Sequence, residues 1–256
     1  MHDGRVMTDQ CEKTDHQEKS NAAFASDEVA GSAWYRTYDL RYEEDVVVRS
    51  FAKGKRVLDL GCGYGRTTVA LRNLGYDVVG ADIVPRMIEG ARAAHPDIEY
   101  RVMDACALDC SDRSFDYVLF SFNGIDCILP ESRRLLAMKE ILRVLKPGGQ
   151  VILSSHSWLP YLLHPRHWGS GRFLSLFRSG SLRRRWYQAG VENVGFDCYI
   201  GTPFRTVRQL KSVGFQNVRI VAGRCKTLRA IGGSPLMVMW RDLWPHFLAD
   251  RPMDSQ

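Results

Sequence analysis

The sequence contains no apolar run long enough to span a bilayer, and its start lacks the hydrophobic core of a signal peptide. No segment repeats at a fixed period, which excludes solenoids and propellers. Its seven cysteines have neither the paired spacing of a metal site nor that of a disulfide framework. These absences predict a soluble, cytoplasmic protein with reduced thiols and no bound metal. The 256 residues have a near-average apolar content, which suits one α/β domain with a large core.

Charge is distributed unevenly along the chain. Residues 1–30 contain seven acids and three bases, residues 31–150 contain seventeen of each, and residues 151–256 contain fifteen bases and five acids. The first segment is polar, mostly aperiodic and poor in large apolar groups. It therefore predicts a disordered tail over residues 1–28, ahead of a single domain over residues 29–256.

Residues 57–68, VLDLGCGYGRTT, are the most informative stretch because an apolar run joins a helix start through a turn with three alternating glycines. Gly61 and Gly63 can adopt positive φ and carry no Cβ, so a ligand can lie against the backbone at the carboxyl end of a strand. A dinucleotide fingerprint would be GxGxxG, but here the third glycine, Gly65, comes one residue early. The acid before the turn, Asp59, suits a cationic ligand group and repels a pyrophosphate.

The signals that follow have the order of a doubly wound sheet. A short apolar run over 77–82 ends in Asp82, at the distance from which a βαβ unit brings a carboxylate to a ribose. Further strands are predicted over 98–103, 115–121 and 150–154, the last after a helix over 138–145 that the residues LKPGG end. Asp82 and Asp104 have an alternative reading as caps of the helices that follow their strands.

The remaining elements lie at the two ends of this series. Aromatic and apolar residues recur at helical spacing from 33 to 51, which predicts an amphipathic helix before the first strand. Near the other end, 203–213 reads as a helix closed by a glycine, followed by strands over 217–222 and 236–240.

These motifs together resemble the class I S-adenosylmethionine-dependent methyltransferases, whose first motif has the form DxGxGxG. The resemblance covers residues 33–241. It implies a Rossmann-like, doubly wound, seven-stranded, mostly parallel sheet, with a substrate cap inserted after strand five over residues 156–200. It also implies S-adenosyl-L-methionine as cofactor, with Asp82 at the ribose and Asp104 beside the adenine amino group.

The cofactor-binding residues expected from the motifs and the resemblance surround the glycine turn and the ends of the next strands. Aromatic faces attract a sulfonium, so Tyr35 and Tyr38 are predicted to close over the methionine part of the ligand, with an ordinary core stripe as the alternative. The predicted set is Tyr35, Asp59, Gly61, Cys62, Gly63, Asp82, Ile83, Met87, Asp104, Ala105, Ser121 and Phe122.

The excess positive charge belongs to the cap, where aromatic residues alternate with arginines. This composition suits a small acceptor with a flat or greasy body and an acidic group. Arg183–Arg185 have an alternative reading as a solvated face, or as part of a membrane-surface helix. Nucleic acid is disfavoured as a partner because the exit of the fourth strand reads Ser121-Phe122-Asn123-Gly124, without the (D/N)PP(Y/F) turn of amino-methylating nucleic-acid enzymes.

Methyl transfer from a sulfonium requires the protein mainly to align donor and acceptor and to exclude water. If the acceptor is a hydroxyl, His156, just past the fifth strand, is the predicted general base, with a structural role as the alternative. The sequence thus predicts a methyltransferase acting on an oxygen or nitrogen of a secondary-metabolite-like small molecule. An RNA or protein methyltransferase and a non-catalytic cofactor-binding regulatory domain are the alternatives.

Overall fold

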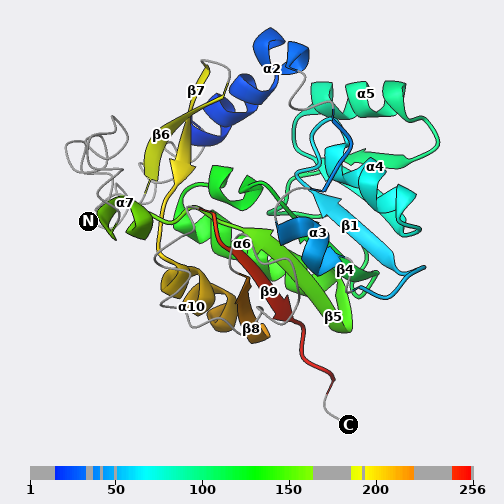
Figure 1. Ribbon diagram of the computed structural model, residues 1–256, viewed down its shortest axis with the longest axis vertical. Helices are drawn as coiled ribbons and strands as arrows, with labels where there is room; N and C mark the ends of the chain where they lie inside the picture. The colour runs from blue at the N-terminus through cyan, green and yellow to red at the C-terminus, as the bar shows by residue number, and fades with distance from the viewer. Residues whose placement is uncertain are drawn as a thin grey trace, which may run out of the picture.

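The structure of the protein is a computed structural model. A seven-stranded sheet forms its centre, with the strand order β3-β2-β1-β4-β5-β9-β8 (Figure 1). The described residues are 15–32, 37–40, 43–48, 51–163, 186–191, 194–221 and 244–254.

Six of the seven strands run in the same direction, and five of these pair with one another in parallel. These five are β1 (Arg56–Leu60), β2 (Asp77–Asp82), β3 (Glu99–Val102), β4 (Phe115–Phe120) and β5 (Leu145–Ser154). The sheet is completed by β8 (Gln216–Val221) and by β9 (His246–Asp250), which pairs antiparallel with both β5 and β8. The predicted Rossmann-like, mostly parallel sheet is confirmed. The last described strand, β9, begins at His246, whereas the sequence predicts the last strand over 236–240. Residues 236–240 lie outside the described residues.

Alternate residues of the strands pack against helices on opposite faces of the sheet. Leu58 and Leu60 of β1 share one core with α6 (Glu131–Val144) and α10 (Pro203–Val213). Val57 belongs to a second core with α3 (Glu43–Val48), α4 (Arg66–Asn73) and α5 (Pro85–Ala94). Successive side chains of a strand point to opposite faces of the sheet. A run of apolar residues therefore gives the sheet two apolar faces, and helices cover both of them.

The predicted disordered tail is wrong over residues 15–28. Residues 15–24 are helical and lead through a short turn into α2 (Asp27–Gly31). Ser20 and Ala23 are buried at 1% exposure, and His16 Nδ1 lies 2.5 Å from Asp197 Oδ2 in β7 (Val194–Tyr199). A narrow stripe of small and polar residues at helical spacing holds this helix in place, and its low hydrophobicity explains why the sequence reads as a tail. Residues 1–14 lie outside the described chain.

The helix predicted over residues 33–51 is wrong in its extent. Only α3 is helical within the described part of this range, and residues 37–40 are irregular. Tyr38 is 39% exposed and packs edge-on against His95, with ring centroids 4.5 Å apart, so it does not cover a ligand as predicted. The predicted partner Tyr35 lies outside the described residues.

The described part of the predicted cap is a short helix and a hairpin. The helix α7 (Leu159–Leu163) follows β5, and β6 (Trp186–Val191) pairs antiparallel with β7 in a separate two-stranded sheet. This hairpin lies beside the N-terminal helix in Figure 1. The arginine run 183–185 lies outside the described residues. No helix in the described part of the chain is both long and apolar enough to cross a membrane.

Candidate functional site

A cavity of about 480 Å³ lies at the carboxyl ends of β1, β2 and β4. This is the edge of a parallel sheet at which ligands bind in doubly wound folds. Of the residues that the sequence predicts for the site, those that line the cavity are Gly61, Cys62, Gly63, Asp82, Ile83, Met87, Asp104, Ala105, Ser121, Phe122 and His156.

The turn after β1 requires its glycines. Gly61, Gly63 and Gly65 have φ of +69°, +56° and +87°. A Cβ on Gly61 would lie 2.8 Å from Phe120 Cε2, and one on Gly65 would lie 2.5 Å from the Tyr100 hydroxyl. The turn therefore presents bare backbone to the cavity, as close approach of a ligand requires.

Asp82 is fixed at the end of β2 by backbone donors. Its Oδ2 accepts a hydrogen bond from the Gly63 amide at 2.9 Å, and its Oδ1 accepts one from the Val84 amide at 2.9 Å. Burial raises the pKa of Asp82 above its ordinary value, and the backbone donors oppose that shift. Each oxygen keeps a further lone pair, so the carboxylate can cap α5 and also accept a ligand hydroxyl.

Asp104 is likewise preset in the cavity wall. Its Oδ1 accepts from the Cys106 amide at 2.8 Å, and its Oδ2 lies 2.8 Å from Arg133 Nη2. Ala105 follows it in the lining. The acid thus caps the turn after β3 and remains at the cavity edge.

Asp59 is not among the described residues that line the cavity, which corrects its prediction as a contact for a cationic ligand group. Its Oδ2 accepts hydrogen bonds from the hydroxyls of Thr67 and Thr68, each at 2.6 Å, and its exposure is 1%. It therefore ties the start of α4 to β1 beneath the glycine turn. Burial raises the pKa of Asp59 to about 6.

The titration of Asp59 predicts a pH dependence of stability. Because its pKa is about 6 in the folded protein and 3.8 by the ordinary value, the folded state binds the proton more tightly, and its stability falls as pH rises through this range. The Asp59→Asn variant lacks this loss. We expect urea unfolding to show wild type losing about 2 kcal/mol relative to Asp59→Asn between pH 4 and pH 7. The exposed Asp112→Asn is the matched control, and profiles for Asp59→Asn that run parallel to wild type would contradict the assignment.

The exit of β4 forms the floor of the cavity. Phe122 and Asn123 have φ of +53° and +59°, which is uncommon outside glycine. The Ser121 hydroxyl and Asn123 Oδ1 are buried without a hydrogen-bond partner among the described residues. Strained backbone and unsatisfied polar atoms beside one cavity are typical of a ligand site.

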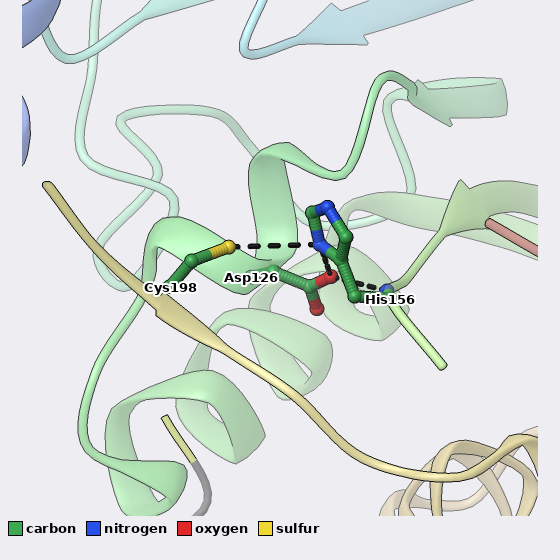
Figure 2. A group of neighbouring side chains, drawn as sticks. All are labelled: Asp126, His156 and Cys198. Atoms are coloured by element: carbon green, nitrogen blue, oxygen red, sulfur yellow. Dashed lines mark hydrogen bonds and ion pairs between the residues drawn. The ribbon is translucent and has the colours of Figure 1, made fainter. Parts of the chain in front are cut away.

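His156 lines the cavity and forms a pair with Asp126 (Figure 2). Asp126 belongs to η2 (Gly124–Cys127), and its Oδ2 lies 2.8 Å from His156 Nδ1 and accepts from the His156 amide at 2.6 Å. Because an ionised carboxylate only accepts hydrogen bonds, Nδ1 carries the proton. Nε2, which points away from Asp126 in Figure 2, is then the basic nitrogen of the neutral ring.

A buried arginine supports this pair from behind. Arg134 and Asp126 are both at 0% exposure, and Arg134 Nη1 lies 2.5 Å from Asp126 Oδ1. The same guanidinium donates to the Ile125 carbonyl, to the Ser155 hydroxyl and to Gln209 Oε1, and it stacks 4.3 Å from the Tyr199 ring centroid. The guanidinium thus places a positive charge directly beside the Asp126 carboxylate.

Asp126, His156 and Cys198 offer three possible metal-ligand atoms within 4.8 Å of one another. The Cys198 sulfur lies 3.5 Å from His156 Nδ1 (Figure 2). Burial raises the pKa of the Cys198 thiol well above its usual range, and Arg134 already matches the charge of Asp126. A cation here would have to displace the thiol proton and the Nδ1 proton beside a guanidinium. The arrangement therefore fits a hydrogen-bonded cluster better than a metal site.

Sequence reasoning missed Asp126, Arg134, Cys198 and the N-terminal helix. Asp126 lies in the loop after a central strand, where ligands gather, and this position was a usable signal. Arg134 and Cys198 carry none, because their roles depend on contacts across long stretches of chain. The cysteines in the described part of the chain are free thiols.

The cavity fits a sulfonium nucleoside. A bare glycine turn, a fixed acid at the end of β2 and buried unpartnered oxygens at the end of β4 face the same space. These groups can accept hydrogen bonds from ligand hydroxyls and from an amine. A pyrophosphate would need a cationic partner, but no described lysine or arginine of the turn is available for one, because Arg66 binds Glu44 through two hydrogen bonds of 2.9 Å.

Residues 57–149 match the sequence model of a family described as a methyltransferase domain. Over 111 residues the chain is 35% identical to a demethylmenaquinone methyltransferase of Beutenbergia cavernae, a segment that covers 42% of this chain and 45% of that protein. Over 119 residues it is 34% identical to a ubiquinone biosynthesis O-methyltransferase of Roseobacter denitrificans, covering 44% and 46%. The matches thus span less than half the length of these curated relatives.

Solved structures share the fold over most of the chain. An S-adenosylmethionine-dependent methyltransferase of Methanosarcina mazei superposes with a TM-score of 0.63 at 20% identity, covering 84% of this chain and all of that one. Another from Mesorhizobium loti has a TM-score of 0.56 at 22% identity, covering 82% and 97%. Residues 57–149 thus match a methyltransferase domain, within a chain whose fold is shared with S-adenosylmethionine-dependent methyltransferases of known structure.

Proposed function

We propose that the protein transfers a methyl group from S-adenosylmethionine to an oxygen or nitrogen of a small-molecule acceptor, an oxygen being favoured. The observation that carries this proposal is one continuous cavity. It joins the glycine turn and Asp82, which suit a nucleoside, to His156, which is paired with Asp126 and suits a general base. A cytoplasmic setting is part of the proposal.

The residues of the sheet edge bind and orient the donor. Asp82 accepts hydrogen bonds from the ribose hydroxyls. The turn at Gly61 and Gly63 leaves room for the methionine part of the donor. We assign the wall at Asp104 and Ala105 to the adenine, as the resemblance implies. When bound, the donor would supply an electrophilic methyl group, with the neutral thioether of S-adenosylhomocysteine as the leaving group. The protein contributes alignment and exclusion of water, and alignment alone is worth about 7–11 kcal/mol in favourable cases.

His156 takes the acceptor's proton. Its Nδ1 proton stays on the hydrogen bond to Asp126, so Nε2 is the nitrogen that receives the proton of an acceptor hydroxyl as the new oxygen–carbon bond forms. The carboxylate of Asp126 stabilises the imidazolium that results, and Arg134 keeps that carboxylate in place. This is a reason to prefer oxygen as the accepting atom.

The names of the relatives are compatible with this acceptor class. One relative is named for demethylmenaquinone and another for O-methylation in ubiquinone biosynthesis. The arginine-rich segment that suggested an acidic acceptor lies outside the described residues, so it adds no support for an acidic group.

The ribose role of Asp82 is testable by a single substitution. Asp82→Ala removes an acceptor for ribose hydroxyls and also a cap of α5, so we expect affinity for S-adenosylhomocysteine to fall by about 1.5–3 kcal/mol. Calorimetric titration measures this loss. Asp77→Ala, at the exposed start of the same strand, is the matched control. Equal affinity of wild type and Asp82→Ala would remove the ribose assignment.

The reaction itself is tested by incubating the protein with methyl-labelled S-adenosylmethionine and separated metabolite, protein and RNA fractions of a cell extract. We expect label in the metabolite fraction only. Label in protein or RNA would favour those acceptors instead. Tight binding of the donor with no transfer to any fraction would favour a non-catalytic regulatory domain.

A further inference from the structure

The lining of the cavity continues past the cofactor residues to a second group of residues, and we call the part of the cavity beside them the outer chamber. It lies between the N-terminal helix over residues 15–24 and the cap strand β7. The helix contributes Gln17, Ser20 and Phe24, β7 contributes Phe196 and Cys198, and Trp244 lies beside His156. The general base therefore faces this chamber from within the same cavity.

Aromatic rings define the shape of the outer chamber. Phe24 and Phe196 are in contact, with ring centroids 5.0 Å apart and planes at 51°. The Trp244 ring centroid lies 6.1 Å from that of His156, edge-on, and also 6.1 Å from that of Phe122. Rings of this kind bind a flat aromatic body through offset and edge contacts, each worth more than its buried area alone.

The charged side chains of the described cavity wall have hydrogen-bond or ion-pair partners within the protein. Arg66 is held by Glu44, Asp104 by Arg133, and Asp82 by backbone amides, among the described lining residues. A charged acceptor entering the chamber would lose its hydration without gaining a counter-ion from these groups. The described wall thus favours an uncharged ligand.

One buried polar atom in the chamber lacks a partner. Ser20 is 1% exposed, lines the cavity, and its hydroxyl has no hydrogen-bond partner among the described residues. A hydroxyl buried in this way costs free energy unless a ligand satisfies it. It is therefore suited to a second oxygen of the acceptor, at a distance from the atom that faces His156.

We propose that the outer chamber is the acceptor site. The acceptor is an uncharged, flat aromatic molecule that carries two oxygen substituents, one directed toward His156 and one toward Ser20. This inference rests on the proposed function and names its substrate class. It assigns the N-terminal helix, through Phe24 and Ser20, as a wall that determines acceptor specificity.

The test measures binding to the protein saturated with S-adenosylhomocysteine, by calorimetry, with no turnover required. The probes are 2-naphthol, 2,6-dihydroxynaphthalene and 2-naphthoate. We expect both naphthols to bind and the naphthoate to bind at least tenfold more weakly. Phe24→Ala is expected to weaken both naphthols about tenfold. The exposed Lys19→Ala, on the same helix, is the control and should leave both affinities within twofold.

Ser20→Ala separates a binding role from a folding role, because two probes are compared in one variant. We expect a three- to tenfold loss of affinity for 2,6-dihydroxynaphthalene and less than a twofold change for 2-naphthol. Absence of naphthol binding, naphthoate binding as tight as naphthol, or wild-type affinities in both Phe24→Ala and Ser20→Ala would overturn the proposal. Loss of S-adenosylhomocysteine binding by wild type would instead overturn the proposed function.

Discussion

Replacing His156 with alanine is expected to lower kcat by a factor of about 10² to 10⁴, the usual contribution of a general base, and to leave the affinity for S-adenosylhomocysteine unchanged. The reason is the position of the ring. Nδ1 is held 2.8 Å from Asp126 Oδ2, which leaves Nε2 to receive a proton, while the nucleoside contacts lie at the glycine turn and Asp82. Single-turnover rates and calorimetry separate the two effects.

The control for this substitution is His95→Ala. His95 packs against the exposed ring of Tyr38 and is not among the described residues of the cavity, so its loss should leave kcat within a factor of two. Asp126→Asn should lower kcat in the same direction as His156→Ala, since an amide no longer fixes the Nδ1 proton as a carboxylate does. If His156→Ala retains the wild-type rate, proton transfer to this ring is not part of the reaction.

Arg134→Met is expected to destabilise the folded protein by about 3–5 kcal/mol, the cost of leaving a buried charge without its partner. Arg134 is fully buried and lies 2.5 Å from Asp126 Oδ1, so a methionine of similar length leaves the Asp126 carboxylate uncompensated. Urea unfolding at neutral pH measures the loss. The surviving folded fraction should also turn over slowly, because Asp126 then no longer orients His156.

Its neighbour on the same helix provides a matched control. Arg133 pairs with Asp104 at a partly exposed position, with side-chain exposures of 30% and 36%, so Arg133→Met should cost no more than about 1 kcal/mol. Adding Asp126→Asn to Arg134→Met should recover part of the lost stability, because the unpaired charge is removed. An Arg134→Met variant as stable as Arg133→Met would show that the buried pair contributes nothing net.

The parallel part of the sheet was predictable because each of its strands has a sequence signal within a few neighbouring residues. Apolar runs such as 115–121 must be buried on both faces, and the glycines at 61, 63 and 65 are required by positive φ and by side chains that a Cβ would strike. Such signals lie within a few residues of one another. The cofactor half of the cavity follows from them.

The acceptor half was not predictable, because its contacts join distant segments. Asp126 meets His156 across 30 residues, and His16 meets Asp197 across 181 residues. The N-terminal helix has a weakly apolar stripe that gains its stability from the cap strand, so composition alone reads it as a tail. Asp59 was misassigned because a sequence shows an acid before the turn but not that Thr67 and Thr68 occupy its carboxylate.

The central claim is that the turn after β1 binds a sulfonium nucleoside and not a dinucleotide. Calorimetric titration of wild-type protein with S-adenosylhomocysteine and, separately, with NAD tests it most directly. The account predicts saturable one-to-one binding of S-adenosylhomocysteine and no heat from NAD. Saturable binding of NAD, with S-adenosylhomocysteine giving no heat, would contradict it.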